Sequence, residues 1–91
     1  MYFEDHLKEE MKNPQFKRAF EEKKYLLELG MVISETREKL GLSQRELAQK
    51  SHVTQQQLSK IENGYNCNLL TLIKVSSALG LDLTLSAALS A

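Results

Sequence analysis

The sequence predicts an all-α protein, and three observations carry that prediction. The 91 residues include four glycines and one proline, so loops should be few and short. Apolar residues recur every three or four positions along most of the chain, which is the period of a helix with one buried face. Residues that cap helix starts, such as Ser43 and Thr54, precede several of these runs. A chain of this length is expected to fold as one domain with short appendages.

The first predicted helix covers residues 3–12. Phe3, Leu7 and Met11 recur every four residues within it, so they should form one stripe along its surface. Asn13 then marks a boundary, because asparagine is a good N-cap and the proline that follows it suits the first position of a new helix.

A long second helix is expected over residues 14–40. Phe16, Phe20 and Leu27 line one side of it, and a second stripe of apolar residues continues to its end. Gly30 lies inside this helix, where glycine is weakly destabilising, so a kink or break at that residue stays open as an alternative.

Three shorter helices should follow. Ser43 with Glu46, and Thr54 with Gln57, have the spacing of capping boxes, in which side chains bond free backbone N–H groups at the helix start. The three helices are expected over residues 44–51, 55–63 and 69–79, with Asn68 capping the last one and Gly80 ending it.

A short C-terminal strand is predicted over residues 81–85, where apolar and polar side chains alternate. A lone strand has no partner in a helical chain, so pairing with its copy in a second subunit would satisfy its backbone groups. Leu81, Leu83 and Leu85 are therefore the expected contacts of a homodimer. Whether the dimer forms through this strand, the last helix or both stays open.

Composition narrows the function classes. The single cysteine, Cys67, cannot form an internal disulfide. The first ten residues lack the basic and apolar regions of a signal peptide, and no apolar run approaches the roughly 18 residues of a membrane span. The expected location is the cytoplasm, with no membrane partner. Twelve basic and twelve acidic residues give a net charge of zero, so a role on nucleic acid would depend on individually placed contacts and on dimerisation.

Two short capped helices that lie three residues apart have the layout of a helix-turn-helix, whose second helix enters the major groove of DNA. The link between them needs a residue that tolerates a positive φ, and His52 is of a type enriched there. Gln55, Gln56 and Gln57 begin the second helix, and glutamine can bond the edge of adenine through two hydrogen bonds. Three glutamines are also common on a plain solvated helix face, so this pattern alone does not distinguish a DNA-binding surface from an ordinary solvated one.

Residues 42–64, LSQRELAQKSHVTQQQLSKIENG, closely resemble the helix-turn-helix of lambdoid phage repressors and of the wider Cro/C1-type (XRE) family. The resemblance extends from Leu29 to about Leu83 and implies a lambda-repressor-like bundle that binds double-stranded operator DNA as a dimer. It implies that Gln55 and Gln56 contact bases. The residues that the resemblance places toward DNA are Gln44, Thr54, Gln55, Gln56, Gln57, Ser59, Lys60 and Asn63.

The same resemblance pairs Arg37 with Glu62 in a structural salt bridge, whereas Arg37 taken alone would be a solvated surface charge. His52 stands where the family usually has glycine, and Cys67 where a proline often precedes the last helix. Both departures bear on local stability and not on the expected DNA contacts. The expected organisation is an N-terminal helical extension over residues 1–28 and a DNA-binding and dimerisation domain over residues 29–91.

The N-terminal extension, placed before such a domain, resembles the HigA antitoxins of type II toxin–antitoxin pairs. The run from Asn13 onward, NPQFKRAFEEKKYLLELG, looks like the segment with which sequences of that group begin. The resemblance implies a HigB toxin of the RelE-like ribonuclease class as partner, and repression of the protein's own operon. The expected partner contacts are the apolar anchors Phe3, Leu7, Met11, Phe16, Phe20 and Tyr25, which could instead pack back on the domain as extra core.

Neither catalysis nor a cofactor is expected. His6 and His52 are far apart in the sequence and form no cluster with Cys67 at zinc spacing, so no metal site is predicted. No glycine-rich phosphate loop follows a strand. Three functions remain: an antitoxin that represses its own operon, a stand-alone XRE-family repressor, and a protein inhibitor or adaptor that keeps a vestigial DNA motif. The neutral net charge is the best support for the third.

Overall fold

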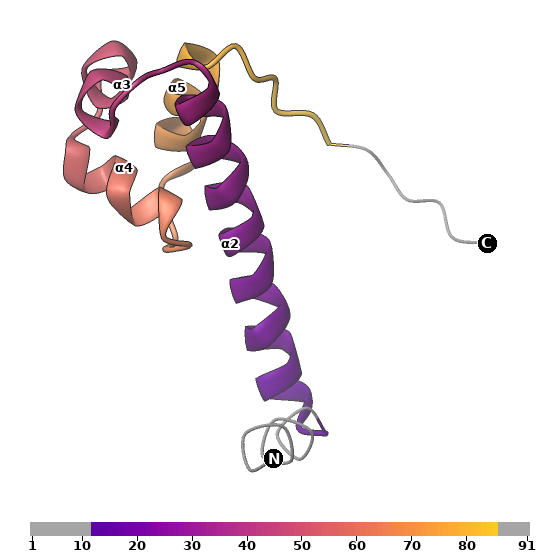
Figure 1. Cartoon of the computed structure of the whole chain (residues 1–91). Helices are drawn as coiled ribbons and strands as arrows, with labels where there is room; N and C mark the ends of the chain where they lie inside the picture. The colour runs from indigo at the N-terminus through magenta and orange to yellow at the C-terminus, as the bar shows by residue number, and fades with distance from the viewer. Residues whose placement is uncertain (1–11, 86–91) are drawn as a thin grey trace.

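The computed structural model describes residues 12–85, and within them the chain forms four helices. The C-terminal half of α2 packs with three shorter helices, whereas its N-terminal half projects away from them (Figure 1). The all-α prediction is confirmed for this part of the chain. Phe3, Leu7 and Met11, which define the first predicted helix, lie outside the described residues. The helices are α2 (Pro14–Lys39), α3 (Gln44–Ser51), α4 (Gln55–Glu62) and α5 (Leu69–Ala78).

Helix α2 begins and ends where its local signals predict. The side-chain oxygen of Asn13 accepts hydrogen bonds from the backbone N–H groups of Gln15 at 2.9 Å and Phe16 at 3.4 Å. Leu40 caps the other end. The helix runs through Gly30 without a break, so the kink that was left open there does not occur. This continuous helix crosses the expected boundary between residues 28 and 29.

Both predicted capping boxes are present. In the first, the Ser43 hydroxyl accepts from the backbone N–H of Glu46 at 3.0 Å, and the Glu46 carboxylate accepts from the backbone N–H of Ser43 at 3.0 Å. Hydrogen bonding of the Glu46 carboxylate by Ser43, by its backbone N–H above all and also by its side chain, lowers the pKa of Glu46. In the second box, Thr54 and Gln57 exchange the same pair of bonds at 3.0 and 2.9 Å. Helices of eight residues are marginal alone, so these caps help each of them to form.

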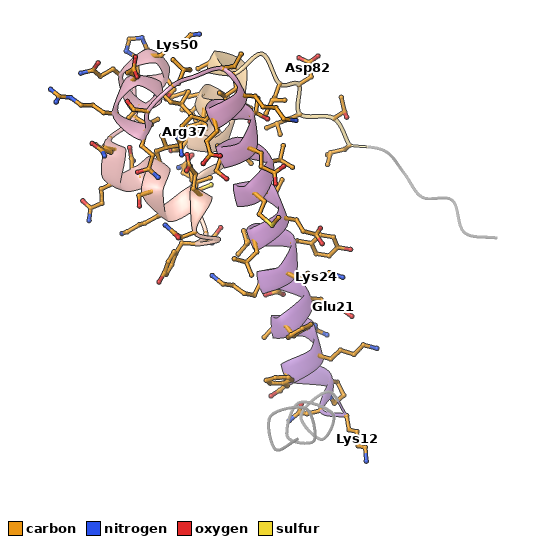
Figure 2. All side chains as sticks on the ribbon, in the orientation of Figure 1. Lys12, Glu21, Lys24, Arg37, Lys50 and Asp82 are labelled. Carbon is orange, nitrogen blue, oxygen red and sulfur yellow. The ribbon has the colours of Figure 1, made fainter. Side chains whose placement is uncertain are left out.

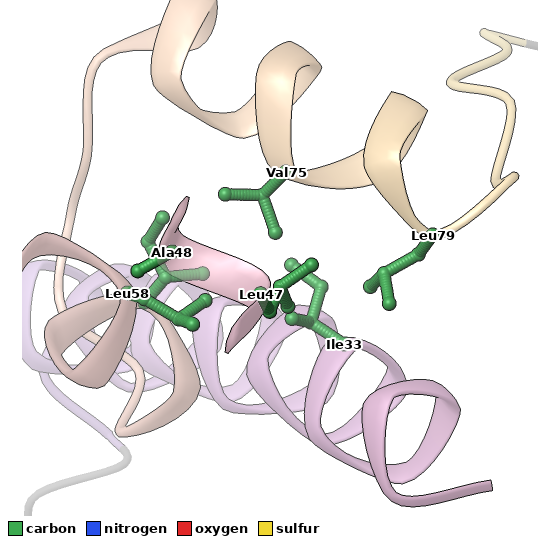
Figure 3. Packing of buried hydrophobic residues seen from close by; sticks show 7 residues of the cluster. Ile33, Leu47, Ala48, Leu58, Val75 and Leu79 are labelled. Atoms are coloured by element: carbon green, nitrogen blue, oxygen red, sulfur yellow. The ribbon is translucent and has the colours of Figure 1, made fainter. Parts of the chain in front are cut away.

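The core lies where all four helices meet (Figure 3). Leu47 from α3, Leu58 from α4 and Val75 from α5 are fully buried there. Truncating one such leucine to alanine typically costs about 2–5 kcal/mol. The remaining core residues are Ile33, Ala48, Ile61 and Leu79.

The prediction of a short strand over residues 81–85 is wrong for this single chain. The segment leaves the end of α5 with no regular secondary structure and extends away from the helices (Figure 1). The physical reason is that a strand needs a neighbouring backbone to satisfy its polar groups, and none lies beside this segment within residues 12–85. Leu81 is half-buried against the core, whereas Leu83 is 47% exposed and the Leu85 side chain is fully exposed.

Candidate nucleic-acid interface

Helices α3 and α4 are joined by a tight turn, as a helix-turn-helix requires. The turn passes through His52, whose φ of 60° and ψ of 40° lie in the left-handed region. The backbone N–H of Val53 closes the end of α3 by donating to the carbonyl of Ala48 at 3.0 Å. Histidine adopts this conformation at some cost, and glycine would adopt it freely. His52 therefore takes up the left-handed conformation at the position where a glycine was expected from the resemblance.

Helix α4 is anchored by one face and open on the other. Leu58 and Ile61 are buried against the core. The opposite side carries polar residues that reach solvent, so a partner could approach it without unfolding anything. The residues expected from the sequence to face DNA divide into the exposed Thr54, Gln55, Gln56, Gln57, Lys60 and Asn63 and the half-buried Gln44 and Ser59.

The three glutamines at the start of α4 are not equivalent. Gln57 caps the helix, because its side-chain oxygen accepts from the backbone N–H of Thr54 at 2.9 Å. Gln55 and Gln56 make no side-chain hydrogen bond to any residue between 12 and 85, and both are exposed. A free side-chain amide can donate and accept at once, as adenine recognition requires. The structure therefore leaves two of the three amides available for a ligand.

A buried ionic network lies behind this face. The Arg37 guanidinium donates to both carboxylate oxygens of Glu62, at 2.9 and 3.1 Å, and the two side chains are 13% and 6% exposed. The hydrogen bond to Glu62 raises the pKa of Arg37. Gln44, at the start of α3, donates to Glu62 at 3.1 Å. One carboxylate thus joins α2, α3 and α4, with Arg37 at the centre of the assembly (Figure 2).

Gly30 permits the close approach of α2 to the end of α4. A Cβ atom built on Gly30 would lie 2.5 Å from the carbonyl oxygen of Ile61 and 2.7 Å from that of Glu62. Both neighbours are backbone atoms, which cannot rotate out of the way. The glycine is therefore required by packing, a reason that its position in the sequence does not reveal.

A left-handed glycine ends α4. Gly64 has a φ of 80°, and its backbone N–H donates to the carbonyl of Ile61 at 3.1 Å. The next N–H, that of Tyr65, reaches back to the carbonyl of Lys60 at 2.9 Å, which completes the pattern of a Schellman motif. A Cβ atom on Gly64 would also lie 2.6 Å from the Leu27 side chain, so this turn rests directly on α2.

Lys23 of α2 contacts the same turn, and sequence reasoning missed this contact. Its ammonium group donates to the carbonyl oxygen of Gly64 at 2.7 Å and lies 4.7 Å from the centre of the Tyr65 ring. In the sequence Lys23 only interrupts an apolar stripe of the long helix. A lysine four residues before Leu27 and seven before Gly30 shares their face of the helix, and this spacing is the signal that could have found it.

The expected partner-binding residues within the described chain lie on the projecting half of α2, residues 14–29, which we call the stem. The Phe16 and Phe20 rings stack with their centres 6.4 Å apart. Phe20 is 42% exposed and Tyr25 is 68% exposed, so neither is buried as extra core. Figure 2 labels Glu21 and Lys24 on the part of the stem that projects from the three shorter helices.

Other chemistries have little support in this part of the chain. Between residues 12 and 85, no three His, Cys, Asp or Glu side chains gather as a metal ion would need. Across the same span, none of the helices combines the length and the apolar character that crossing a bilayer demands. The thiol of Cys67 is partly buried, and burial raises its pKa. That shift opposes formation of a reactive thiolate.

Comparison with known proteins agrees with this geometry. A family model described as Helix-turn-helix matches residues 33–85, which is more than half of the chain. The match covers α3, α4, α5 and the last turns of α2, and it leaves out the whole of the stem. The family is one of DNA-binding regulatory domains of the XRE type and not an enzyme family. No curated protein matches the chain.

Proposed function

The chain belongs to the helix-turn-helix family, and from that premise we propose that it is a HigA-type antitoxin that also represses its own operon. Sequence-specific DNA binding and transcription regulation are the functions of the family. The proposal adds a HigB/RelE-like ribonuclease toxin as partner and a homodimer as the DNA-binding unit. The observation that carries it is the stem, a helical arm with exposed aromatic side chains that lies outside the part of the chain matched by the family model.

The first part of the proposal is that Gln55 and Gln56 read bases in the major groove. They are exposed at the start of α4, where the backbone N–H groups of a helix also favour nearby phosphate. Gln56→Ala should lower the preference for the operator over random DNA by about 1–3 kcal/mol and leave non-specific binding intact. Gln49→Ala, at an exposed glutamine of α3 outside the expected DNA contacts, is the matched control.

Gel shifts on operator and random duplexes measure this preference. Equal losses on both duplexes would show that Gln56 does not read sequence. The operator can be taken from the DNA upstream of the protein's own gene, since the proposal includes self-repression. A steep fall of affinity with salt is expected as well, because phosphate contacts release counterions.

The second part of the proposal is that the toxin docks on the stem. Apolar anchors repeated along one helix are the usual way in which an amphipathic helix engages a protein groove. Phe16 and Phe20 lie one turn apart and stack, which provides a rigid apolar surface at small entropic cost. Tyr25 lies further along the stem, with 68% of its surface open to solvent.

Co-expression with the neighbouring open reading frame tests this part. We expect a stable complex and rescue of growth, and loss of both with Phe20→Ser combined with Tyr25→Ser. Leu40→Ser removes an equally exposed apolar side chain at the far end of α2 and should change neither. A complex that survives the double variant, or the absence of any complex, would exclude the stem as the toxin site.

The third part is that two copies associate through α5 and the segment after it. A groove of about 590 Å³ lies between this segment and the helices, lined by Leu29, Ile73 and Leu83 among others. The proposed contacts on the segment are Leu81, Leu83 and Leu85, which could pair with the copy in the second subunit and satisfy the backbone there. Sedimentation should find a dimer, and Leu83→Asp should give a monomer with weaker operator binding. If the unaltered protein sediments as a monomer, this part of the proposal is wrong.

A stand-alone XRE-family repressor is the second candidate. It is favoured by the contacts of Lys23 and Leu27 with the turn at Gly64, which make part of the stem a support for the DNA-binding helix. In that case no toxin partner exists, and the stem serves the fold alone. The co-expression experiment separates the two candidates, because the repressor alone predicts no complex with the neighbouring gene product.

A further inference from the structure

We propose that Lys23 is a positioning residue for DNA binding, which holds the far end of α4 from outside the family's matched region. The proposal concerns how the stem supports the family's DNA-binding helix, and it requires no toxin partner. Lys23 lies ten residues before the first matched residue, Ile33. It nevertheless contacts the turn that ends α4.

The contact sits at a place where α4 needs support. An eight-residue helix has little stability of its own, so its orientation depends on what holds its two ends. The first end is closed by the capping box of Thr54 and Gln57. The second end is closed by the turn at Gly64 and Tyr65, and Lys23 bonds the carbonyl oxygen of that turn.

The ammonium group also changes the local charge. The carbonyl end of a helix carries a partial negative charge, which would repel a DNA phosphate approaching the turn. Lys23 donates to the Gly64 carbonyl at 2.7 Å and lies 4.7 Å from the Tyr65 ring centre, close enough for a cation–π contact. A single side chain therefore compensates the helix end and restrains the ring beside it.

The path from Lys23 to the ionic network is continuous along one face of α2. Leu27 follows Lys23 by four residues and packs on Gly64, and Gly30 follows Leu27 by three and lies against the carbonyls at the end of α4. Arg37, two turns further on, binds Glu62. We call this row of contacts along α2, formed by Lys23, Leu27, Gly30 and Arg37, the seam. The seam extends into the stem, so the fold of α4 depends on residues beyond the region that the family model matches.

Lys24 offers a matched control. It is the next residue, carries the same charge, and its side chain makes no hydrogen bond or ion pair with residues 12–85. Successive residues turn by about 100° around a helix, so its side chain leaves the seam. Lys23→Met and Lys24→Met therefore remove the same charge from the same turn of the stem, and only the first removes the contact with Gly64.

The first measurement is amide hydrogen exchange on the full chain without DNA. Lys23→Met should accelerate exchange at Gly64 and Tyr65 by about tenfold, since a hydrogen bond to a charged group and a cation–π contact are both lost. Amides of the core, such as that of Leu47, should not change. Lys23→Arg should restore most of the protection, and Lys24→Met should leave it intact. Uniform acceleration along the chain, or none at the turn, would overturn the proposal.

The second measurement is DNA affinity at several salt concentrations, on a duplex that the unaltered protein selects from a randomised pool. Lys23→Met should weaken binding about tenfold more than Lys24→Met, with the salt dependence unchanged between the two variants. A salt slope reduced by about 0.9 in Lys23→Met alone would assign Lys23 to a direct phosphate contact instead. Equal losses in both variants would reduce its role to long-range charge. Because hydrogen exchange needs no DNA, failure of this inference and failure of DNA binding are distinguishable.

Discussion

The two halves of α2 have the same local structure and different surroundings. From residue 30 to residue 39 the helix packs on the bundle, where Gly30 and Ile33 are buried and Arg37 binds Glu62. From residue 14 to residue 29 no residue is buried, although the helix continues unchanged. Local signals thus decide where a helix runs, whereas burial depends on what lies opposite it. The stem is the part of α2 that lies wholly outside the match to the family model, and its aromatic side chains Phe20 and Tyr25 are exposed.

The largest difference between the halves should appear when a charge is removed from each. Arg37→Met or Glu62→Leu leaves one buried charge without its partner, which typically costs about 3–5 kcal/mol of unfolding free energy. Arg18→Met on the stem removes an exposed charge and should change stability by less than about 0.5 kcal/mol. Urea unfolding followed by circular dichroism measures all three variants.

The double variant sharpens this test. Combining Arg37→Met with Glu62→Leu removes both charges, so much of the loss should be recovered. Arg37 also donates to the carbonyl of Leu42 at 2.8 Å, so the recovery should be incomplete. Additive losses in the double variant would contradict the view that the pair acts as a unit.

A smaller effect is expected at the boundary of the two halves. Gly30→Ala adds a methyl group against two backbone carbonyls, and overpacking of this kind typically costs about 1–3 kcal/mol. Alanine favours helices by up to about 1 kcal/mol over glycine, so the net loss is smaller than the clash alone. Glu28→Ala, two residues earlier and exposed, is the control. A Gly30→Ala protein that melts at a higher temperature would show that α4 can move away without cost.

The outer end of the stem, around Phe16 and Phe20, should contribute little to stability. Phe20 is 42% exposed and stacks only on Phe16 among the aromatic rings between residues 12 and 85, so Phe20→Ala should change the unfolding free energy by about 0.5 kcal/mol or less. Leu58→Ala in the core should cost about 2–5 kcal/mol. Thermal unfolding of the two variants compares the halves directly. A loss of comparable size at Phe20 would mean that the stem is part of the core.

The smallest effect concerns pH. Hydrogen bonds from Ser43 hold the pKa of Glu46 below its ordinary value, so this carboxylate stabilises the fold above the pKa of the unfolded chain. That contribution is lost as pH falls through the lower, folded pKa. Stability of the unaltered protein should therefore fall more steeply from about pH 5 to pH 3 than that of Glu46→Gln. Denaturation series at several pH values check this, with Glu21→Gln on the stem as control. Parallel curves for the unaltered protein and Glu46→Gln would contradict it.

Helix bounds were predicted well because their signals are local. Asn13, Ser43 and Thr54 each bond backbone groups two or three residues away, so a short window of sequence contains the whole interaction. The same reasoning placed His52 in the left-handed turn between α3 and α4. The strand over residues 81–85 does not form in the single chain, because its alternation is local while the backbone partner that a strand needs is not.

The candidate site was predicted in part. The resemblance named Gln55, Gln56 and Gln57 together, and the structure separates Gln57, which caps α4, from the two free amides. The bond from Gln44 to Glu62 was not foreseen, because the two residues are 18 positions apart. Lys23 was missed for the same reason, since its partner Gly64 is 41 positions away.

The sequence by itself determined the helical class, the capped ends of the four described helices and the helix-turn-helix layout. Each of these depends on side chains that act within one or two turns of their own backbone. Only the tertiary structure decided that Gly30 lies against the end of α4, that Gly64 lies against α2, and that the outer end of the stem projects from the core (Figure 1). Such contacts join residues that chain order keeps far apart, and their energies depend on distances that only the folded packing sets.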